Sequence, residues 1–159
     1  MPRPDGTKLV ASNRRARRNY EVLETVEAGM VLRGSEVKSL RLGHVQISDA
    51  FARFDGGEVW LESLHIAPYE NSQMHSGHEA ERARKLLLHR DEIARLRSKV
   101  DEQRLSLVPL SIYFKDGKVK IDLALARGRK TYDKRHVIAE RDAARDADRA
   151  VAHARRGGR

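Results

Sequence analysis

Several residue types and patterns are missing from this 159-residue chain, and each absence removes a class of function. There is no cysteine, which excludes disulfides, thiolate metal ligands and cysteine nucleophiles. The first residues lack the apolar stretch of a signal peptide, and no apolar run approaches the roughly 18 to 20 residues that span a bilayer. We therefore expect a cytoplasmic protein with no membrane partner.

Motifs for catalysis and metal binding are equally scarce. The sequence contains no GxSxG elbow, no Walker A loop and no GxGxxG. His75, His78 and Glu79 form the one cluster of candidate metal ligands, and their spacing matches no strong zinc motif. A metal-dependent nuclease built on these three residues is the most distant of our hypotheses. We expect no enzyme activity, no cofactor and no bound metal.

The charge of the chain points to a polyanionic partner. Charged residues make up 35% of the sequence, and 32 Lys and Arg against 23 Asp and Glu give a formal net charge of +9. Of the 32 cations 23 are Arg, the side chain that forks onto phosphates and stacks on bases. RNA is therefore the first candidate partner.

The positive charge is concentrated at the two ends. Positions 1–20 carry a net charge of +5 and positions 127–159 a net charge of +6, whereas positions 21–126 carry −2. Such polar ends bury too little apolar surface to order themselves, so we expect both to be mobile until a polyanion binds. The predicted organisation is a basic arm (1–19), a barrel domain (20–126) and a basic tail (127–159). Ends that only keep the domain soluble are the alternative.

The middle of the chain is patterned mostly as β-structure. Alternating apolar and polar residues predict a strand at 20–22. The residues at 27–29 predict a turn, and a second strand is expected from Met30. Turn signals at 55–57 and 115–118 predict two hairpins, with strands over 47–54, 58–66, 107–114 and 119–126.

Helical patterns are fewer, and one stretch has no pattern at all. A helical turn or two is expected over 35–41, with Ser35 as N-cap, and one clear helix over 90–103. Positions 68–82 show no periodicity and predict a long loop.

The number of short strands predicts the fold class. Five or six strands with one intervening helix are typical of a small barrel, of which the oligonucleotide-binding (OB) barrel is the nearest familiar type. We therefore predict a mainly β, six-stranded OB-type barrel with two or three short helices and a flexible basic C-terminal tail. An open α+β sheet ranks second because its edges would need covering.

The tail carries a basic pattern of its own. Arg141, Arg145, Arg149 and His153 recur every four residues, so a helix here would present a basic stripe. With little to bury, such a helix is marginal in water and should form on contact with phosphates. A solvated terminal helix held by pairs such as Asp142 with Arg145 is the alternative.

Taken together and in order, several blocks of the sequence resemble the SsrA-binding protein (small protein B, SmpB) family. The blocks are NRRARRNY from Asn13, EAG from Glu27, GSEVKSLRLG from Gly34, SDAF from Ser48, HIAPYE from His65, RKLLLHRDEI from Arg84 and GRKTYDKR from Gly128. The resemblance implies an OB-type barrel that binds the tRNA-like part of transfer-messenger RNA (tmRNA). It also implies delivery of that RNA, with GTP-bound elongation factor Tu, to ribosomes stalled on messages without a stop codon. The family's C-terminal tail occupies the decoding centre and the empty mRNA channel. We expect a monomer.

The resemblance also assigns candidate RNA contacts. Asn13, Glu27 and Leu87 match family positions associated with tmRNA binding. Glu27 can only accept hydrogen bonds, for example from guanine or cytosine amines, although a glutamate here could equally cap a turn. We expect phosphate contacts with tmRNA from Arg14, Arg15, Lys38, Arg41, Arg84 and Lys85. Ribosome contacts in the tail are expected from Arg129, Lys130, Tyr132, Asp133, Lys134, Arg135, Arg141 and Arg145.

Two departures from the family pattern are visible. Arg129 stands where the family usually has lysine, which retains the charge, and the residues at 79–82 replace a usual Asp-Pro-x-Arg pattern, which leaves the local loop shape open. The leading alternative to the tmRNA adaptor is a general ribosome-associated or initiation-type OB protein without a dedicated RNA partner.

Overall fold

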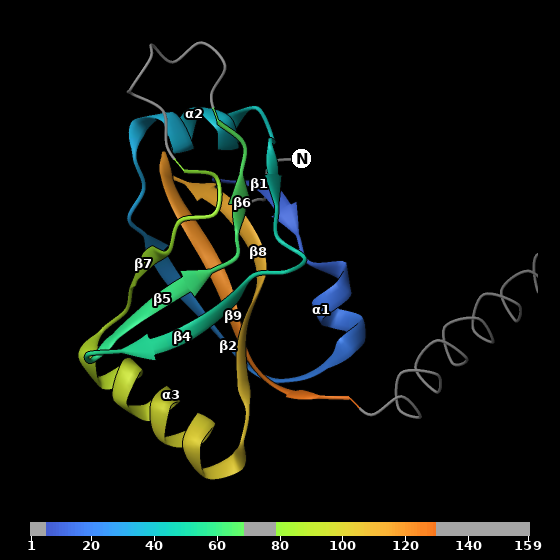
Figure 1. Cartoon of the computed structure of the whole chain (residues 1–159), viewed down its shortest axis with the longest axis vertical. Helices are drawn as coiled ribbons and strands as arrows, with labels where there is room; N and C mark the ends of the chain where they lie inside the picture. The colour runs from blue at the N-terminus through green and yellow to red at the C-terminus, as the bar shows by residue number, and fades with distance from the viewer. Residues whose placement is uncertain (1–5, 69–78, 130–159) are drawn as a thin grey trace, which may run out of the picture. The chain divides into compact units, whose positions relative to one another are not determined.

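The computed structural model describes residues 6–68 and 79–129 (Figure 1). The chain divides into two compact units, 1–128 and 129–159, and the elements below belong to the first. In chain order they are β1 (Thr7–Ser12), α1 (Arg14–Asn19), β2 (Tyr20–Met30), α2 (Gly34–Arg41), β3 (Val45–Gln46), β4 (Phe51–Asp55), β5 (Glu58–Glu62), β6 (His65–Ile66), β7 (Arg84–Leu87), α3 (Arg90–Gln103), β8 (Ser106–Lys115) and β9 (Lys118–Gly128).

Six antiparallel strands form a closed ring in the order β8-β4-β5-β7-β2-β9, and β9 pairs with β8 again. The link between β4 and β8 is a single residue pair, Ala52 opposite Leu107. The seventh strand of the sheet, β1, pairs with β8, while β3 and β6 form a separate two-stranded sheet. A mainly β fold with six ring strands and three helices in the described residues agrees with the prediction at this level.

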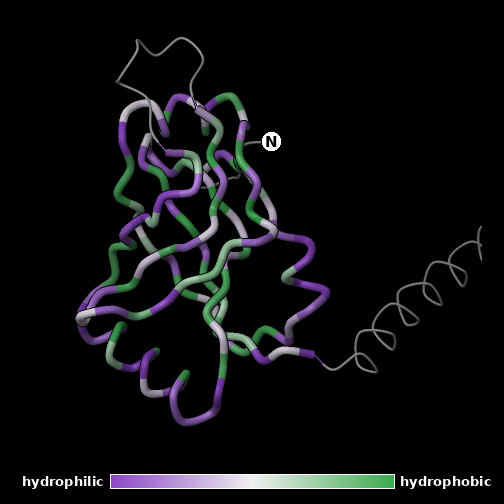
Figure 2. Tube along the Cα trace, in the orientation of Figure 1, coloured by the Kyte–Doolittle hydropathy of each residue, from purple (hydrophilic) through white to green (hydrophobic). Residues whose placement is uncertain are grey.

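The ring encloses the main apolar core. Ile112 and Phe114 of β8 and Ile121 and Leu123 of β9 belong to this buried cluster and alternate with more polar residues along the strands. Figure 2 shows the alternation as changes between hydrophobic and hydrophilic colour along the trace. The helices α2 and α3 lie at opposite ends of the ring (Figure 1).

Both hairpins and the long helix lie where the sequence predicts them. Asp55 pairs with Glu58 and Lys115 with Lys118, so each hairpin has a two-residue turn. The helix α3 buries Leu96 completely, in a cluster with Leu105 and Leu125. Within the described part of the chain, no helix is both long and apolar enough to cross a membrane. Of the predicted 68–82 loop, residues 69–78 lie outside the described residues.

The basic arm expected to be mobile over 1–19 is structured from Thr7 onwards. Residues 7–12 form β1 and pair with β8, and α1 follows directly. Helix α1 buries Ala16 against Val108 and Leu110 of β8. The prediction was wrong because it weighed the charge of the segment and missed the main-chain hydrogen bonds that β8 provides.

Two further local predictions are corrected. The turn expected at 27–29 is absent, since β2 runs unbroken from Tyr20 to Met30 and pairs with β9 at all three positions. The N-cap of α2 is Arg33, whose backbone N–H donates to Oε1 of Glu36 at 2.8 Å, and Ser35 lies inside the helix. At 27–29 strand pairing across a long sequence separation overrides the local signal, whereas at α2 the cap is a local capping box between Arg33 and Glu36.

A buried ion pair joins α2 to β7. Glu36 and Arg84 both have side chains that are 0% exposed, and Nε of Arg84 donates to Oε2 of Glu36 at 2.7 Å. Arg84 also donates to the backbone carbonyls of Leu64 and Ala80, and Arg82 donates to the other oxygen of Glu36. The charges are therefore paired and the remaining donors are largely satisfied.

The environment of Glu36 has a pH consequence. Burial acts to raise the pKa of Glu36, but hydrogen bonds from Arg82, the Arg33 backbone and Arg84 outweigh it and hold that pKa below 4.5. Because the folded-state pKa is depressed, the stabilisation is present above the unfolded value and is lost as the pH falls through the folded value. The ion pair thus contributes fully at neutral pH and fails in acid.

Replacing Glu36 with Ala should lower the free energy of unfolding by about 3–5 kcal/mol, because it leaves the Arg84 guanidinium buried without its carboxylate. Urea unfolding followed by circular dichroism measures the loss. Glu62→Ala is the matched control, since its pair with Arg53 is partly exposed and should be worth about 1 kcal/mol or less. Equal losses in the two variants would contradict the assignment.

Candidate nucleic-acid interface

The RNA contacts expected from the sequence separate into distinct places on the ring. Glu27 and Leu87 stand on β2 and β7, Lys38 and Arg41 on α2, and Arg14 with its neighbours on α1. The sequence could not show this separation, because it depends on which strands pair.

Glu27 lies in a polar cluster on the outer face of the ring. Its carboxylate accepts a hydrogen bond from the hydroxyl of Tyr113, and Nζ of Lys115 lies 3.5 Å from the same oxygen. The Tyr113 hydroxyl also lies 2.9 Å from Asp122, which receives a bond from Ser111 at 3.2 Å. Burial and the two carboxylates raise the pKa of Tyr113 far above its usual value, so its hydroxyl stays protonated.

Leu87 presents an apolar side chain beside this cluster. It is 52% exposed although its neighbour Leu86 is buried, because the strand alternates. Gly29 pairs with Leu87 across β2 and β7, and a Cβ at Gly29 would lie 3.3 Å from the Cβ of Leu87. A hollow of about 290 Å³ runs along Leu87, with Lys118 and Lys120 in its lining. An apolar floor with ammonium groups at its side suits a base with its phosphate.

The cations predicted on α2 and β7 have different environments. Lys38 and Arg41 are exposed, and the Arg41 guanidinium lies 4.8 Å from the centre of the Phe114 ring. Lys85 is partly exposed and forms an ion pair of 2.9 Å with Glu58. Arg84 is fully buried against Glu36, which corrects its assignment as a phosphate contact.

Asn13 is also buried, with 1% of its surface exposed. Its Oδ1 accepts from the backbone N–H of Ala16 and caps α1, while Nδ2 donates to the carbonyl oxygens of Pro109 and Ile47. The amide is thus used inside the protein, which differs from the direct RNA contact expected from the sequence. Asn13 holds α1 in place instead.

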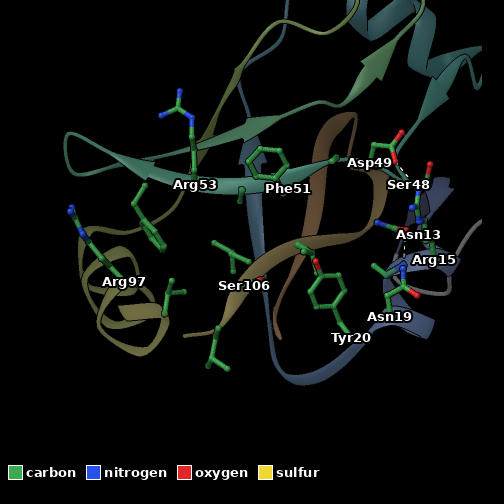
Figure 3. A pocket seen from close by; sticks show the side chains of 18 of the residues that line it. Asn13, Arg15, Asn19, Tyr20, Ser48, Asp49, Phe51, Arg53, Arg97 and Ser106 are labelled. Atoms are coloured by element: carbon green, nitrogen blue, oxygen red, sulfur yellow. Dashed lines mark hydrogen bonds and ion pairs between the residues drawn. The ribbon is translucent and has the colours of Figure 1, made fainter. Parts of the chain in front are cut away.

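Helix α1 borders a cavity of about 650 Å³ that no sequence pattern predicted (Figure 3). Phe51, which is 46% exposed, lines it from β4, and Tyr20 lines it from the start of β2. Figure 3 shows Arg53 and Arg97 at one end of this cavity and Arg15 at the other. Arg15 forms an exposed ion pair with Asp49 at 2.8 Å. The cavity shares no lining residue with the hollow beside Leu87.

The sequence analysis missed Tyr113, Asp122 and Phe51. The pattern of the β8–β9 hairpin carries a usable signal for the first two, since Tyr113 and Asp122 fall on the face opposite the apolar Ile112 and Ile121. Phe51 carries no such signal, because an aromatic residue in a strand is usually taken for core.

Some predicted sites lie outside the described residues. These are His75 and His78 of the metal hypothesis and the tail contacts Lys130, Tyr132, Asp133, Lys134, Arg135, Arg141 and Arg145. Over residues 6–68 and 79–129, no three His, Asp or Glu side chains gather as metal ligands would.

Comparison with known proteins bears on the whole chain. The family model for "SmpB protein" matches residues 10–153. An SsrA-binding protein of Frankia casuarinae is 54% identical over 99% of this chain and 98% of its own length. The SsrA-binding protein of Saccharopolyspora erythraea is 52% identical over 99% of both chains.

A solved structure agrees with these relatives. It is described as "tmRNA-SmpB: a journey to the center of the bacterial ribosome" and is 54% identical, with a TM-score of 0.63 over 76% of this chain and 85% of the other. With a family model matched over most of its length and relatives more than half identical from end to end, the chain belongs to the SmpB family.

Proposed function

We propose that this protein is a non-enzymatic RNA-binding adaptor for trans-translation. It binds the tRNA-like part of tmRNA and brings it, with elongation factor Tu, to ribosomes stalled in the cytoplasm. The observation that carries the proposal is the end-to-end match to curated SsrA-binding proteins. The arrangement of exposed residues supports it by offering RNA-compatible chemistry in two separate places.

The architecture fits such a role. We propose that the six-stranded ring is an OB-type barrel, since it is antiparallel and closes through a single pair between β4 and β8. Barrels of this type bind nucleic acids on their outer strands and loops, where the Glu27 cluster and Leu87 lie.

The surface formed by Glu27, Leu87, Lys118 and Lys120 is the proposed tmRNA contact. A carboxylate among lysines repels phosphate at one point. It can also accept a hydrogen bond from a base amine or a ribose 2′-hydroxyl. Leu87 supplies an apolar face for an unstacked base. This combination favours a folded RNA with an exposed base over the phosphates of any duplex.

We propose that the cavity beside α1 contacts ribosomal RNA, which differs from the sequence-based expectation that Arg14 and Arg15 contact tmRNA. Arg14, Arg15, Arg17 and Arg18 give α1 four guanidiniums and no acid. Phe51 offers a stacking face within the cavity. The tail, from Arg129 onwards, is proposed to enter the decoding centre and the mRNA channel, where Tyr132 stacks on a base.

Removing residues 129–159 should leave the affinity for tRNA-like RNA nearly unchanged, because the proposed contact surface lies within β2, β7 and β9. The same truncation should abolish tagging of nascent chains on stalled ribosomes. Filter binding and an in vitro tagging assay measure the two effects, with unstructured RNA of equal length as competitor. Normal tagging by the truncated chain would refute the division of labour. Equal binding of the unstructured competitor would favour the general OB protein.

Gly29→Ala should weaken binding of tRNA-like RNA about tenfold, because the added methyl group displaces the Leu87 side chain. Gly34→Ala is the matched control, since no atom lies within 4 Å of a Cβ at that position. Its affinity should equal that of the wild type. Binding is measured at one fixed salt concentration, because phosphate contacts depend on salt.

Phe51→Ala should weaken binding to empty 70S ribosomes by about 1–3 kcal/mol if one base stacks on the ring. The affinity for isolated tRNA-like RNA should stay unchanged, since Phe51 is not part of the Leu87 hollow. Sedimentation with ribosomes and filter binding with RNA give the two values. A loss of RNA affinity alone would reverse the assignment of the two surfaces.

A further inference from the structure

The carboxylate of Glu27 is held by only one of its two oxygens. The Tyr113 hydroxyl and the Lys115 ammonium group both approach Oε2. Within the described part of the chain, Oε1 takes part in no hydrogen bond or ion pair. The side chain is 37% exposed. One oxygen is thus fixed to the protein, and the other is left to accept from a ligand.

The tyrosine that holds Oε2 is itself buried and hydrogen-bonded. Tyr113 is 2% exposed although it stands on the outer face of β8. Its hydroxyl lies 2.9 Å from Oδ1 of Asp122, while Ser111 donates to Oδ2 of the same carboxylate. Glu27 and Ser111 each stand directly opposite Asp122 across the neighbouring strands. The sheet register therefore fixes all four groups on one face.

The single hydrogen of the Tyr113 hydroxyl limits how many carboxylates can accept a hydrogen bond from it. A tyrosine hydroxyl has one hydrogen and here faces two carboxylate oxygens, so it donates to one at a time. Asp122 has the Ser111 hydroxyl as a second donor, which leaves the tyrosine hydrogen for Glu27. The raised pKa of Tyr113 keeps the hydrogen in place at any working pH. Glu27 thus accepts a hydrogen bond from a Tyr113 hydroxyl that stays neutral and protonated.

We propose that Tyr113 is a positioning residue for RNA recognition, which holds Glu27 so that Oε1 meets a hydrogen-bond donor on the RNA, such as the amine of an unpaired base. This rests on the proposed function of the Glu27 surface. A free glutamate side chain loses rotamer freedom when it binds, and a side chain already fixed by Tyr113 avoids that cost. The hydroxyl of Tyr113 contributes to affinity without touching the RNA.

The affinity of the full-length chain for a transcript of the tRNA-like part of tmRNA tests this proposal. Four proteins are compared by filter binding at one salt concentration: wild type, Tyr113→Phe, Glu27→Gln and the double variant. Tyr113→Phe should weaken binding about three- to tenfold, and Glu27→Gln should weaken it more. In the double variant, removal of the hydroxyl should add nothing to the effect of Glu27→Gln, since the carboxylate that it positions is gone.

Ser98→Ala is the control, because it removes an exposed hydroxyl from α3, away from this surface, and should leave the RNA affinity unchanged. Tyr113→Phe keeps the ring and its packing, and thermal unfolding of each variant reports any loss of stability. A merely structural role would weaken binding by the same factor whether residue 27 is Glu or Gln. That additive result would overturn the proposal.

The remaining outcomes separate this proposal from the proposed function. If Glu27→Gln weakens binding and Tyr113→Phe does not, the positioning role is refuted and the RNA surface stands. If Glu27→Gln binds the RNA as the wild type does, the Glu27 contact itself is refuted, and the positioning role with it.

Discussion

The placement of the exposed residues depends on a pair of charges that never reaches the surface. Glu36 and Arg84 meet between α2 and β7, and Arg84 also ties the carbonyl of Leu64 to this point. Two buried charges persist only when each is paired and hydrogen-bonded, so the geometry admits little variation. Side chains alternate along β7, so Lys85 and Leu87 point outward because Arg84 points inward. The same pair fixes the helix that carries Lys38 and Arg41.

Successive residues of a ring strand face the core and the outer surface in turn, so residues that stabilise the fold alternate with residues that are available for recognition. In β8, Ile112 and Phe114 fill the core, while Ser111 and Tyr113 build the polar cluster on the other face. About six residues further back along β8, Leu107 lines the cavity beside α1, which at about 3.3 Å per residue is roughly 20 Å away. One strand therefore connects the two proposed RNA surfaces.

Local sequence signals were enough where the chain folds on itself over short distances. The two hairpins and α3 agree with prediction, because a glycine-containing turn or an apolar stripe acts within a few residues. The prediction of a turn at 27–29 was wrong because a residue far away in the sequence decides the role of Gly29. Gly29 is not there to reverse the chain but to leave room for Leu87, a residue 58 positions later. The prediction of a mobile arm before Tyr20 was wrong for the same reason, since β1 pairs with β8, which begins at Ser106.

The sequence by itself determined the composition of the interface: an excess of arginine, the residues Glu27 and Leu87, and the family to which they belong. Only the tertiary structure decided which of these groups reach a ligand. It buries Arg84 and Asn13, exposes Phe51, and brings Tyr113 from a distant strand to hold Glu27. The reason is that exposure and hydrogen-bond partners depend on strand pairing across large sequence separations, and the identity of a residue does not carry that information.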